Sequence, residues 1–472
     1  MEIIGRYGEQ RTLQQYFESD VPEFIAVYGR RRVGKTYLIK EFFNERFSFY
    51  ISGLANASKE EQLENFRTTL AFYGKTPYAQ AKSWLEAFRQ LIHLLENNRQ
   101  KGKKVIFIDE LPWFDTPRSG FITGLEYFWN SWASGRPDIL LITCGSATSW
   151  MINKLLKNRG GLHNRVTRRM LIEPFSLNEC EAFFKHKKIE QGQQNIVESY
   201  MIFGGIPFYL NMFEKGLSVA QNVDKICFTK KSALKDEFSI LYSSLFKNSE
   251  NHVVVVKVLA KKKMGLTREE IITETKLQGG GLTTVLEELE QCNFIRSYNA
   301  FGKKSKARIF QLVDFYSLFY LNFIENAKQN DEHYWTNFIE NARHRAWSGY
   351  AFEQVCLAHL PQIKRKLGIS GVLTNTASWR SNEKGNAAQI DLVIERNDKV
   401  INLCEMKYAQ EKFVIDKKTD ENLRNKRAAF RNETNTRKTL HLTMITTYGV
   451  KHNEYWNNIQ SEVTMSDLFE YL

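Results

Sequence analysis

The sequence predicts an α/β protein, with a parallel sheet in its N-terminal part, helical modules in the middle and a second α/β domain at its C-terminal end. Short runs of β-branched and other apolar residues alternate with long amphipathic helices up to about residue 143. This alternation is typical of a parallel sheet covered on both faces. Near the other end, a helix precedes three further strand-like runs, at about 389–395, 400–407 and 440–447.

The composition is that of a multidomain globular protein. The 472 residues exceed one compact core, because a domain takes roughly 100–200 residues. No apolar stretch of about 18 residues and no signal-peptide pattern occur, so we expect a cytoplasmic protein that does not cross a membrane. The six cysteines show no CxxC spacing, which suits a reducing compartment and predicts no zinc site. A net charge of +13 favours a polyanionic partner such as nucleic acid, although solvated basic faces would give the same charge.

The first strand leads into a phosphate-binding motif. Residues 23–28 (EFIAVY) predict a buried strand, and a helix is expected from Thr36 to Phe43. The segment between them matches GxxxxGK[ST] and consists of Gly29, Arg30, Arg31, Arg32, Val33, Gly34, Lys35 and Thr36. Its glycines let successive N–H groups face phosphates, Lys35 reaches the β- and γ-phosphates, and Thr36 binds Mg²⁺. The motif therefore predicts an ATP site.

Two further strands predict the rest of this site. Residues 105–108 (VIFI) form the first, and at its end Asp109 is expected to hold Mg²⁺ and Glu110 to act as the general base. Residues 139–143 (ILLIT) form the second, which ends in TCGS. Ser146 is the candidate for orienting the attacking water, with Thr143 second, and a plain strand-end turn is the alternative.

The middle of the chain predicts a helical lid and a winged helix. The pattern is helical from about 177 to 214, and residues 250–312 predict three helices followed by two strands around a basic turn. Thr267 and Glu270 form a capping box for the second helix, and the glycines 279–281 form a turn that opens the third. That third helix is acidic and would repel phosphates, so DNA binding is expected at the wing residues Lys303, Lys304, Lys306 and Arg308. The alternative is a module that only relays conformational change.

Acidic and basic residues in the last domain follow the D-x(n)-ExK pattern of PD-(D/E)XK, or restriction-endonuclease-like, domains. Glu353 lies in the helix, Asp391 on one strand, and Glu405 and Lys407 on the next. Asp391 and Glu405 supply hard oxygen ligands for Mg²⁺ or Mn²⁺, and Glu353 completes the set. Lys407 shares a strand face with Glu405, where it can stabilise a developing oxyanion, and Gln389 shares the face of Asp391. The basic segment 407–438 predicts a backbone-binding surface or an exposed charged helix.

Four motifs in order carry a resemblance to a known family. YGRRRVGKT, FIDELPW, TCGSATSWM and FGGIPFYL resemble the archaeal-type ATPases, a branch of the AAA+/STAND P-loop ATPases. The resemblance covers about residues 2–230, and that family's C-terminal domain extends it over most of the rest. It implies that Gly5 and Arg6 lie near the adenine. It also implies that Gly205-Ile206-Pro207 links the nucleotide state to the following domain.

The same resemblance implies a catalytic arginine at Arg165, which would neutralise charge developing on the γ-phosphate. Family members usually have glycine before this arginine, whereas this sequence has Asn164, so Arg159 and Arg168 remain alternatives. Arg165 would act either on its own nucleotide or on that of a neighbouring copy. The second arrangement would require a homo-oligomer.

Together these observations predict four domains. They are a P-loop ATPase core (1–175), a helical lid (176–245), a winged helix (246–325) and a PD-(D/E)XK nuclease-like domain (326–472). The first hypothesis is an ATP-hydrolysing protein coupled to a metal-dependent nuclease that acts on DNA, or secondarily on RNA. The second is an ATP-operated switch or scaffold, in which the last domain binds a protein or nucleic acid without cutting.

Overall fold

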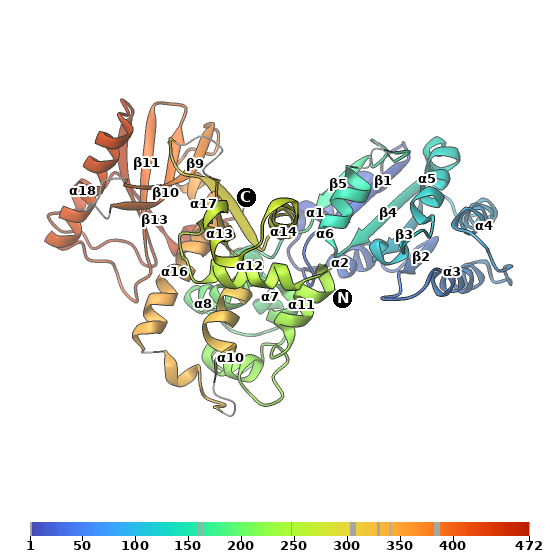
Figure 1. Ribbon diagram of the computed structural model, residues 1–472, viewed down its shortest axis with the longest axis horizontal. Helices are drawn as coiled ribbons and strands as arrows, with labels where there is room; N and C mark the ends of the chain where they lie inside the picture. The colour runs from blue at the N-terminus through green and yellow to red at the C-terminus, as the bar shows by residue number, and fades with distance from the viewer. Residues whose placement is uncertain are drawn as a thin grey trace. The chain divides into compact units, whose positions relative to one another are not determined.

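The computed structural model describes residues 2–157, 160–162, 164–246, 248–302, 308–327, 331–339, 341–381 and 388–471. The chain forms two compact units, Met1–Pro174 with Ser243–Lys247, and Phe175–Tyr242 with Asn248–Leu472 (Figure 1). The predicted α/β fold with a parallel sheet is confirmed, and a second sheet lies near the C-terminal end. The four-domain division stays a prediction. Within the described ranges, no helix is both long and apolar enough to cross a membrane.

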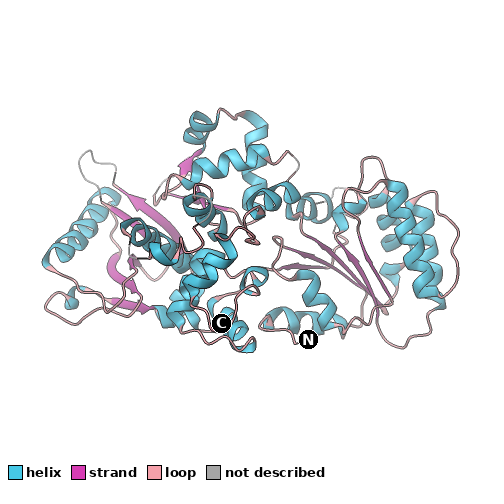
Figure 2. Cartoon of the chain, turned by 90° about the horizontal axis from the view of Figure 1, so that it is seen from below, coloured by secondary structure: helices cyan, strands magenta, loops and turns pink. Residues whose placement is uncertain are grey.

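The first unit is built on a five-stranded parallel sheet with the order β2-β3-β4-β1-β5. Its strands are β1 (Glu23–Tyr28), β2 (Phe49–Ser52), β3 (Lys104–Asp109), β4 (Ile139–Gly145) and β5 (Arg168–Leu171). Figure 2 shows these strands side by side with helices on both faces. Because β4 lies between β1 and β3, the residues that follow these three strands meet at one edge of the sheet.

Helices cover this sheet as the amphipathic pattern predicts. They are α1 (Tyr7–Phe17), α2 (Lys35–Phe42), α3 (Lys59–Gly74), α4 (Trp84–Asn97), α5 (Phe121–Ser131) and α6 (Thr148–Trp150). Alternate strand residues such as Phe24, Ile106 and Leu141 form one core with the apolar sides of α3, α4 and α5. Strand residues alternate between the two faces of a sheet, so the residues between them face the other helical layer.

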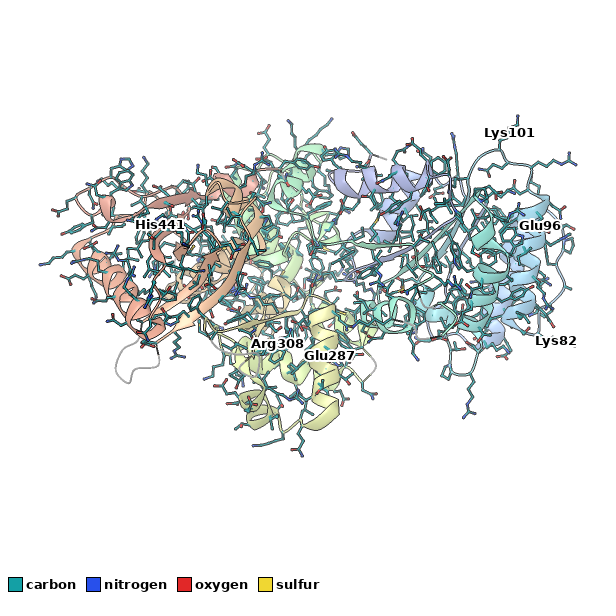
Figure 3. All side chains as sticks on the ribbon, turned by 90° about the horizontal axis from the view of Figure 1, so that it is seen from above. Lys82, Glu96, Lys101, Glu287, Arg308 and His441 are labelled. Atoms are coloured by element: carbon teal, nitrogen blue, oxygen red, sulfur yellow. The ribbon has the colours of Figure 1, made fainter. Side chains whose placement is uncertain are left out.

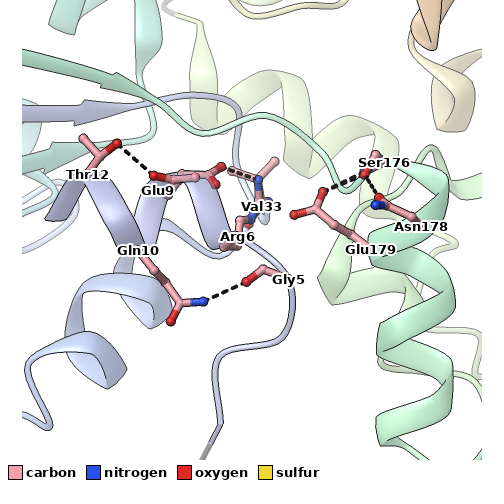
Figure 4. Close-up of polar contacts among 10 residues, drawn as sticks. Gly5, Arg6, Glu9, Gln10, Thr12, Val33, Ser176, Asn178 and Glu179 are labelled. Atoms are coloured by element: carbon pink, nitrogen blue, oxygen red, sulfur yellow. Dashed lines mark hydrogen bonds and ion pairs between the residues drawn. The ribbon is translucent and has the colours of Figure 1, made fainter. Parts of the chain in front are cut away.

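Helices dominate the start of the second unit. They are α7 (Leu177–His186), α8 (Gln193–Phe203), α9 (Pro207–Leu210), α10 (Val219–Cys227) and α11 (Glu237–Leu245), the last of which reaches the boundary of the unit. A capping box starts α7, where the backbone N–H of Ser176 donates to the Glu179 carboxylate at 2.9 Å (Figure 4). That residues 176–245 work as a lid stays a prediction.

A three-helix module with a small antiparallel sheet follows. Its helices are α12 (Glu250–Ala260), α13 (Arg268–Thr275) and α14 (Gly279–Gln291), and its strands β6 (Leu266–Thr267), β7 (Ile295–Asn299) and β8 (Arg308–Leu312) have the order β6-β8-β7. The predicted capping box of Thr267 and Glu270 is present. One detail was wrong: glycines 279–281 form the first turn of α14 instead of a turn before it, with Gln278 as the N-cap. That the module works as a winged helix stays a prediction.

The last part of the chain is a five-stranded mixed sheet with the order β13-β12-β11-β10-β9. Helices α15 (Phe315–Phe319), α16 (Ala342–Ala358) and α17 (Leu360–Lys366) precede its strands β9 (Thr374–Arg380), β10 (Gln389–Arg396), β11 (Val400–Lys407), β12 (Thr439–Thr446) and β13 (Ser461–Thr464). Helix α18 (Lys417–Thr434) connects the parallel strands β11 and β12, and its Leu423 and Phe430 pack on one face of the sheet. Strands β9 and β13 were not predicted.

The three-strand sheet is joined to the edge of the mixed sheet within the same unit. The Phe301 N–H donates to the Ser378 carbonyl at 2.9 Å, and Ala300 and Ser378 form a parallel bridge. The Phe301 ring also lies 4.9 Å from that of Phe430 on α18. Residues predicted to belong to separate domains therefore share a continuous contact.

Candidate functional site

The phosphate-binding motif forms a tight loop between β1 and α2. Gly29 has φ +140°, and a Cβ there would lie 2.2 Å from the Ile172 carbonyl oxygen, so this position requires glycine. Gly34 also has positive φ and caps α2. The buried Lys35 ammonium donates to the carbonyls of Gly29 and Arg30 at 2.9 and 2.8 Å. The loop thus holds a cation over a helix N-terminus, an arrangement suited to an anion such as phosphate.

Arg6 supports this loop from the N-terminal segment. Its guanidinium donates to the Val33 carbonyl at 3.1 Å and pairs with Glu9 at 3.2 Å, and the side chain is buried (Figure 4). The backbone between Gly5 and Arg6 turns sharply, with positive φ at both residues. Arg6 therefore braces the loop, a contact that the sequence did not predict. Its expected place near the adenine stays a prediction.

Asp109 at the end of β3 faces Thr36. The Thr36 hydroxyl donates to Asp109 Oδ2 at 2.8 Å, and the carboxylate is buried. Burial raises the pKa of Asp109, and the negative charge of Glu110 raises it further. A hydroxyl and a buried carboxylate in contact fit a hard cation such as Mg²⁺, which would relieve the cost of burying this charge.

Glu110 and Ser146 meet across β3 and β4. The Ser146 hydroxyl donates to Glu110 Oε2 at 2.9 Å, and its backbone N–H lies 3.3 Å from the same oxygen. Glu110 has a left-handed φ of 46°, which turns its side chain out of the strand direction. Thr143, the second candidate, is fully buried and donates to the Ile25 carbonyl at 3.3 Å inside the sheet. Ser146, rather than Thr143, is therefore next to Glu110.

Arg165 and Arg168, two of the candidate arginines, lie toward the amino-terminal end of β1, away from the phosphate-binding loop. Thr167 bonds to the backbone of Phe24, so the chain near Arg165 lies at the amino end of β1. The phosphate-binding loop follows the carboxyl end, about 16 Å along the strand. The Arg165 side chain is exposed and makes no hydrogen bond or ion pair with the described residues. Arg168 lies beside the start of β1, 3.7 Å from Glu23, and Arg159 is outside the described residues.

Pro207 opens α9 in the second unit, two residues after Gly205. Gly205 has φ +66°, and its carbonyl accepts the Phe175 N–H at 2.8 Å. A Cβ at Gly205 would lie 2.2 Å from the Phe175 carbonyl oxygen. The positive φ and this close contact therefore explain why a glycine stands at position 205 of the Gly-x-Pro segment. Its link to the nucleotide stays a prediction.

The second unit contains a pocket of about 840 Å³ that brings the predicted nuclease residues together. Asp391 and Glu405 come next to the paired residues Leu392 and Cys404 on antiparallel strands. The pairing of β10 with β9 shifts register between Ile390 and Val393, the interval that contains Asp391. The other residues that line the pocket include Lys263, Met264, Glu353, Gln389, Lys407, Lys418, Glu421 and Lys426.

Two lysines hold the Glu405 carboxylate. Lys407 Nζ lies 2.9 Å from Oε1, and Lys426 Nζ from α18 lies 2.7 Å from Oε2. Burial pushes the pKa of Glu405 up, but the two ammonium groups together hold it below its usual value. Lys426 was expected only as part of a basic surface. Its place in the pocket depends on how α18 folds back over β11.

The other two carboxyl groups of the pocket, those of Asp391 and Glu353, have raised pKa values, unlike Glu405. Burial raises the pKa of Asp391, whose Oδ1 accepts one bond from Gln389 Nε2 at 2.7 Å. Burial, reinforced by Asp391, raises the pKa of Glu353 to about 8. Three carboxyls thus line one pocket in different electrostatic settings, as sites for acid–base and metal chemistry require.

The donor chemistry of this pocket fits a metal ion only in part. Asp391 and Glu405 offer carboxylate oxygens from facing strands, the ligand type that Mg²⁺ prefers. However, both Glu405 oxygens contact lysines, and no group of three His, Cys, Asp or Glu residues within the described chain is spaced to hold a metal. A metal ion at Glu405 would have to replace a lysine contact.

Two acidic side chains of α14 in the three-helix module are paired with basic residues. Glu290 of α14 pairs with Arg308 at 3.2 Å, and Glu288 accepts from His252 at 2.8 Å. Figure 3 shows Arg308 and Glu287 on this module. The predicted wing residues Lys303, Lys304 and Lys306 lie outside the described residues.

A family model, a relative and a solved structure are similar to this chain. Residues 4–213 match the family model of an ATPase domain predominantly from Archaea. The uncharacterized protein MJECL04 of Methanocaldococcus jannaschii is 24% identical over 411 residues, which cover 86% of this chain and 87% of that protein. The Walker-type ATPase PABY2304 of Pyrococcus abyssi is similar over 68% of this chain and 96% of its own, with 20% identity and a TM-score of 0.50. The structural likeness supports a shared fold, and the family match supports an ATPase-type function that uses a nucleotide and Mg²⁺.

Proposed function

We propose that the first unit hydrolyses ATP and that the second unit cleaves nucleic acid with the help of a divalent metal ion. The ATPase part rests on one observation above all. Lys35, the Thr36–Asp109 pair and the Ser146–Glu110 pair all follow strands that end at the same edge of one sheet. A cation, a metal-ligand pair and a general base are the groups that phosphoryl transfer to water requires.

Each residue of this set has a distinct task. Lys35 would exchange its two carbonyl partners for the β- and γ-phosphates, and the backbone N–H groups of the loop would bind the same oxygens. Thr36 and Asp109 would hold Mg²⁺, which supplies charge neutralisation at the phosphates. Glu110 would accept a proton from the attacking water, and Ser146 would set the direction of its carboxylate.

Arg165 would serve the nucleotide of a neighbouring copy. The phosphate-binding loop of the same copy follows the carboxyl end of β1, whereas Arg165 lies near the amino end. An exposed guanidinium that makes no hydrogen bond or ion pair with the described residues suits a contact between molecules. We therefore propose a homo-oligomer in which one copy supplies the arginine to the next.

The nuclease part of the proposal rests on the pocket between β10, β11 and α18. Asp391 and Glu405 would bind Mg²⁺ or Mn²⁺, and Glu353 would complete the set. Lys407, which pairs with Glu405 in this structure, would face the scissile phosphate, where an ammonium stabilises the developing oxyanion. Nucleic acid is the proposed substrate because a net charge of +13 favours a polyanion, and DNA is placed before RNA.

The pairing of Glu405 with two lysines favours a second function. Its two lysine contacts neutralise the carboxylate without a metal, as in a structural ion-pair network. In that case the protein is an ATP-operated switch whose C-terminal domain binds nucleic acid or a protein without cutting.

The experiment that separates the two functions uses purified full-length protein with labelled single- and double-stranded DNA and RNA. Cleavage is followed with Mg²⁺ or Mn²⁺, with and without ATP, for the wild type, Lys407→Ala and Lys35→Ala. Lys451→Ala is the matched control, since Lys451 is exposed and does not line the pocket.

Cleavage that Lys407→Ala abolishes and Lys451→Ala keeps would support the nuclease. Additional loss in Lys35→Ala would place cleavage under ATP control. If ATP is hydrolysed but no substrate is cut under any condition, the nuclease proposal is wrong and the switch is favoured.

A further inference from the structure

A short loop of the three-helix module forms part of the nuclease-like pocket. Residues 261–265 connect α12 to β6, far in sequence from β10 and β11, yet Lys263 and Met264 line the same pocket as Asp391 and Glu405. The motif residues of the last domain therefore do not complete this pocket by themselves.

Several contacts fix the position of this loop. Gly265 has φ +75°, and a Cβ there would lie 2.3 Å from the Phe310 carbonyl oxygen, so the chain turns tightly against β8. The Tyr298 hydroxyl donates to the Met264 carbonyl at 2.7 Å, and the Gln311 side-chain amide donates to the Lys263 carbonyl. These partners belong to β7 and β8, so the small sheet determines where the loop lies.

The loop also reaches one of the proposed metal ligands through a single side chain. Gln389 Nε2 lies 2.8 Å from the Met264 sulfur and 2.7 Å from Asp391 Oδ1. Because the Gln389 amide bridges these two atoms, the loop and the Asp391 carboxylate keep a defined relative position.

The charge of Lys263 is available in a way that those of Lys407 and Lys426 are not. Lys407 and Lys426 are both paired with Glu405. The exposed Lys263 ammonium donates to the Ala346 carbonyl at 3.0 Å and lies 5.4 Å from the centre of the Tyr350 ring, and it has no carboxylate within 4.0 Å in the described part of the chain. A carbonyl bond leaves the full positive charge and two N–H donors for an anion.

We propose that Lys263 binds a backbone phosphate of a nucleic acid strand that enters this pocket, so that the substrate contacts the three-helix module and the mixed sheet together. The identity of the ligand rests on the proposed function, whereas the location rests on the loop contacts. The shared chemistry is a phosphodiester backbone, from either DNA or RNA. A strand held on both sides would lie with one phosphate near Lys263 and another near Asp391 and Glu405.

The test measures binding separately from cleavage. Fluorescence anisotropy of labelled single-stranded DNA and RNA is recorded with full-length protein in EDTA, over a range of salt concentrations. We expect Lys263→Ala to raise Kd on the order of five- to tenfold and to reduce the salt dependence of log Kd by about 0.7, the effect of losing one phosphate contact on a single strand. Lys263→Arg should keep both values, because it keeps the charge.

Lys262→Ala is the matched control. Lys262 is the neighbouring exposed lysine and does not line the pocket, so its removal should leave Kd unchanged. An equal loss of affinity in Lys262→Ala and Lys263→Ala would indicate a general charge effect and would overturn the proposal. So would wild-type affinity in Lys263→Ala, or the absence of DNA and RNA binding by the wild type.

The outcomes also distinguish this proposal from the nuclease itself. If the wild type never cuts but Lys263→Ala weakens binding selectively, the nuclease proposal fails and the phosphate site stands. If the wild type cuts and Lys263→Ala changes neither Kd nor the KM for substrate, the nuclease stands and the phosphate site fails.

Discussion

Ser146 and Glu110 directly follow the neighbouring strands β4 and β3, and the serine hydroxyl donates to the glutamate carboxylate at 2.9 Å. The same hydroxyl lies 3.1 Å from the other carboxylate oxygen, so one side chain fixes the plane of the proposed general base. A base acts only when its oxygen faces the water that it deprotonates. Loss of the correct orientation of Glu110 should therefore lower the rate of ATP hydrolysis more than it lowers the affinity for ATP.

Replacing Ser146 by alanine tests this relationship. We expect Ser146→Ala to lower kcat for ATP hydrolysis by about tenfold, with KM changed less than about twofold, because binding uses the loop and not Glu110. Steady-state phosphate release gives both values. Ser146→Thr keeps the hydroxyl and should retain most of the activity. An equal loss in both variants would mean that the hydroxyl is not the cause.

The glycine at the start of the phosphate-binding loop is expected to be essential for the fold as well as for the nucleotide. Gly29→Ala would put a Cβ 2.2 Å from a backbone oxygen, so β1 and the segment after β5 would have to separate. We expect it to lower the free energy of unfolding by about 2 kcal/mol or more and to weaken binding of a fluorescent ATP analogue. Urea unfolding and ligand titration measure the two effects.

Gly8→Ala is the control for that substitution, and it should act in the opposite direction. Gly8 lies in α1 with nothing within 4 Å of an added Cβ. Alanine in a helix is favoured over glycine by about 0.5–1 kcal/mol, so the variant should be slightly more stable. Equal destabilisation by both changes would show that the close contact at Gly29 is not responsible.

The local pattern of the sequence was sufficient for strands β1, β3 and β4 of the first unit, whereas β2 and β5 were not predicted. The strand before Gly29, the helix Trp84–Asn97 and the acids after β3 all follow from apolar runs and one glycine motif. Local pattern was also sufficient for Glu405 and Lys407, because residues two apart in a strand share a face. These features depend on neighbours in sequence, which a single sequence displays.

Features that depend on distant segments were not predicted. Lys426 lies 21 residues from Glu405 and reaches it only because α18 crosses back over the sheet. Met264 meets Gln389 across 125 residues, through a loop whose course β7 and β8 determine. Arg6 contacts the Val33 carbonyl across 27 residues, through a backbone that turns at Gly5. No local periodicity encodes such contacts.

Because Arg165 lies near the amino end of β1, away from the phosphate-binding loop, we expect ATP hydrolysis to need two copies of the protein. Arg165→Ala and Lys35→Ala should each lose hydrolysis by about a hundredfold or more, the first with ATP binding intact. Mixing the two inactive proteins should restore activity several-fold above either alone, because an intact loop then meets an intact arginine from the other copy. Phosphate release over a series of mixing ratios measures this. Mixtures that remain inactive, with mixed oligomers present, would show that Arg165 does not act between copies.

From the buried His359 we expect the second unit to lose stability at acidic pH. The buried ring bonds through Nδ1 to the Val355 carbonyl and accepts the Leu177 N–H, at the start of α7, on Nε2 at 3.1 Å. Burial lowers the pKa of His359 to about 4. A proton on Nε2 would remove this acceptor and place a positive charge at a helix N-terminus, which is unfavourable. The neutral ring is therefore part of the folded state.

The sign of the effect follows from proton uptake. Below about pH 6.5 the unfolded chain protonates this histidine while the folded chain does not, so the stability falls as the pH drops toward 4, by about 3 kcal/mol in total. Urea unfolding midpoints at pH 7 and pH 5 measure the loss. His359→Gln can accept the Leu177 N–H but does not titrate, so it should be less stable at pH 7 yet lose less between the two pH values. His441→Gln, on the partly exposed side of β12 (Figure 3), should keep the wild-type pH dependence, and a matching change there would contradict the assignment to His359.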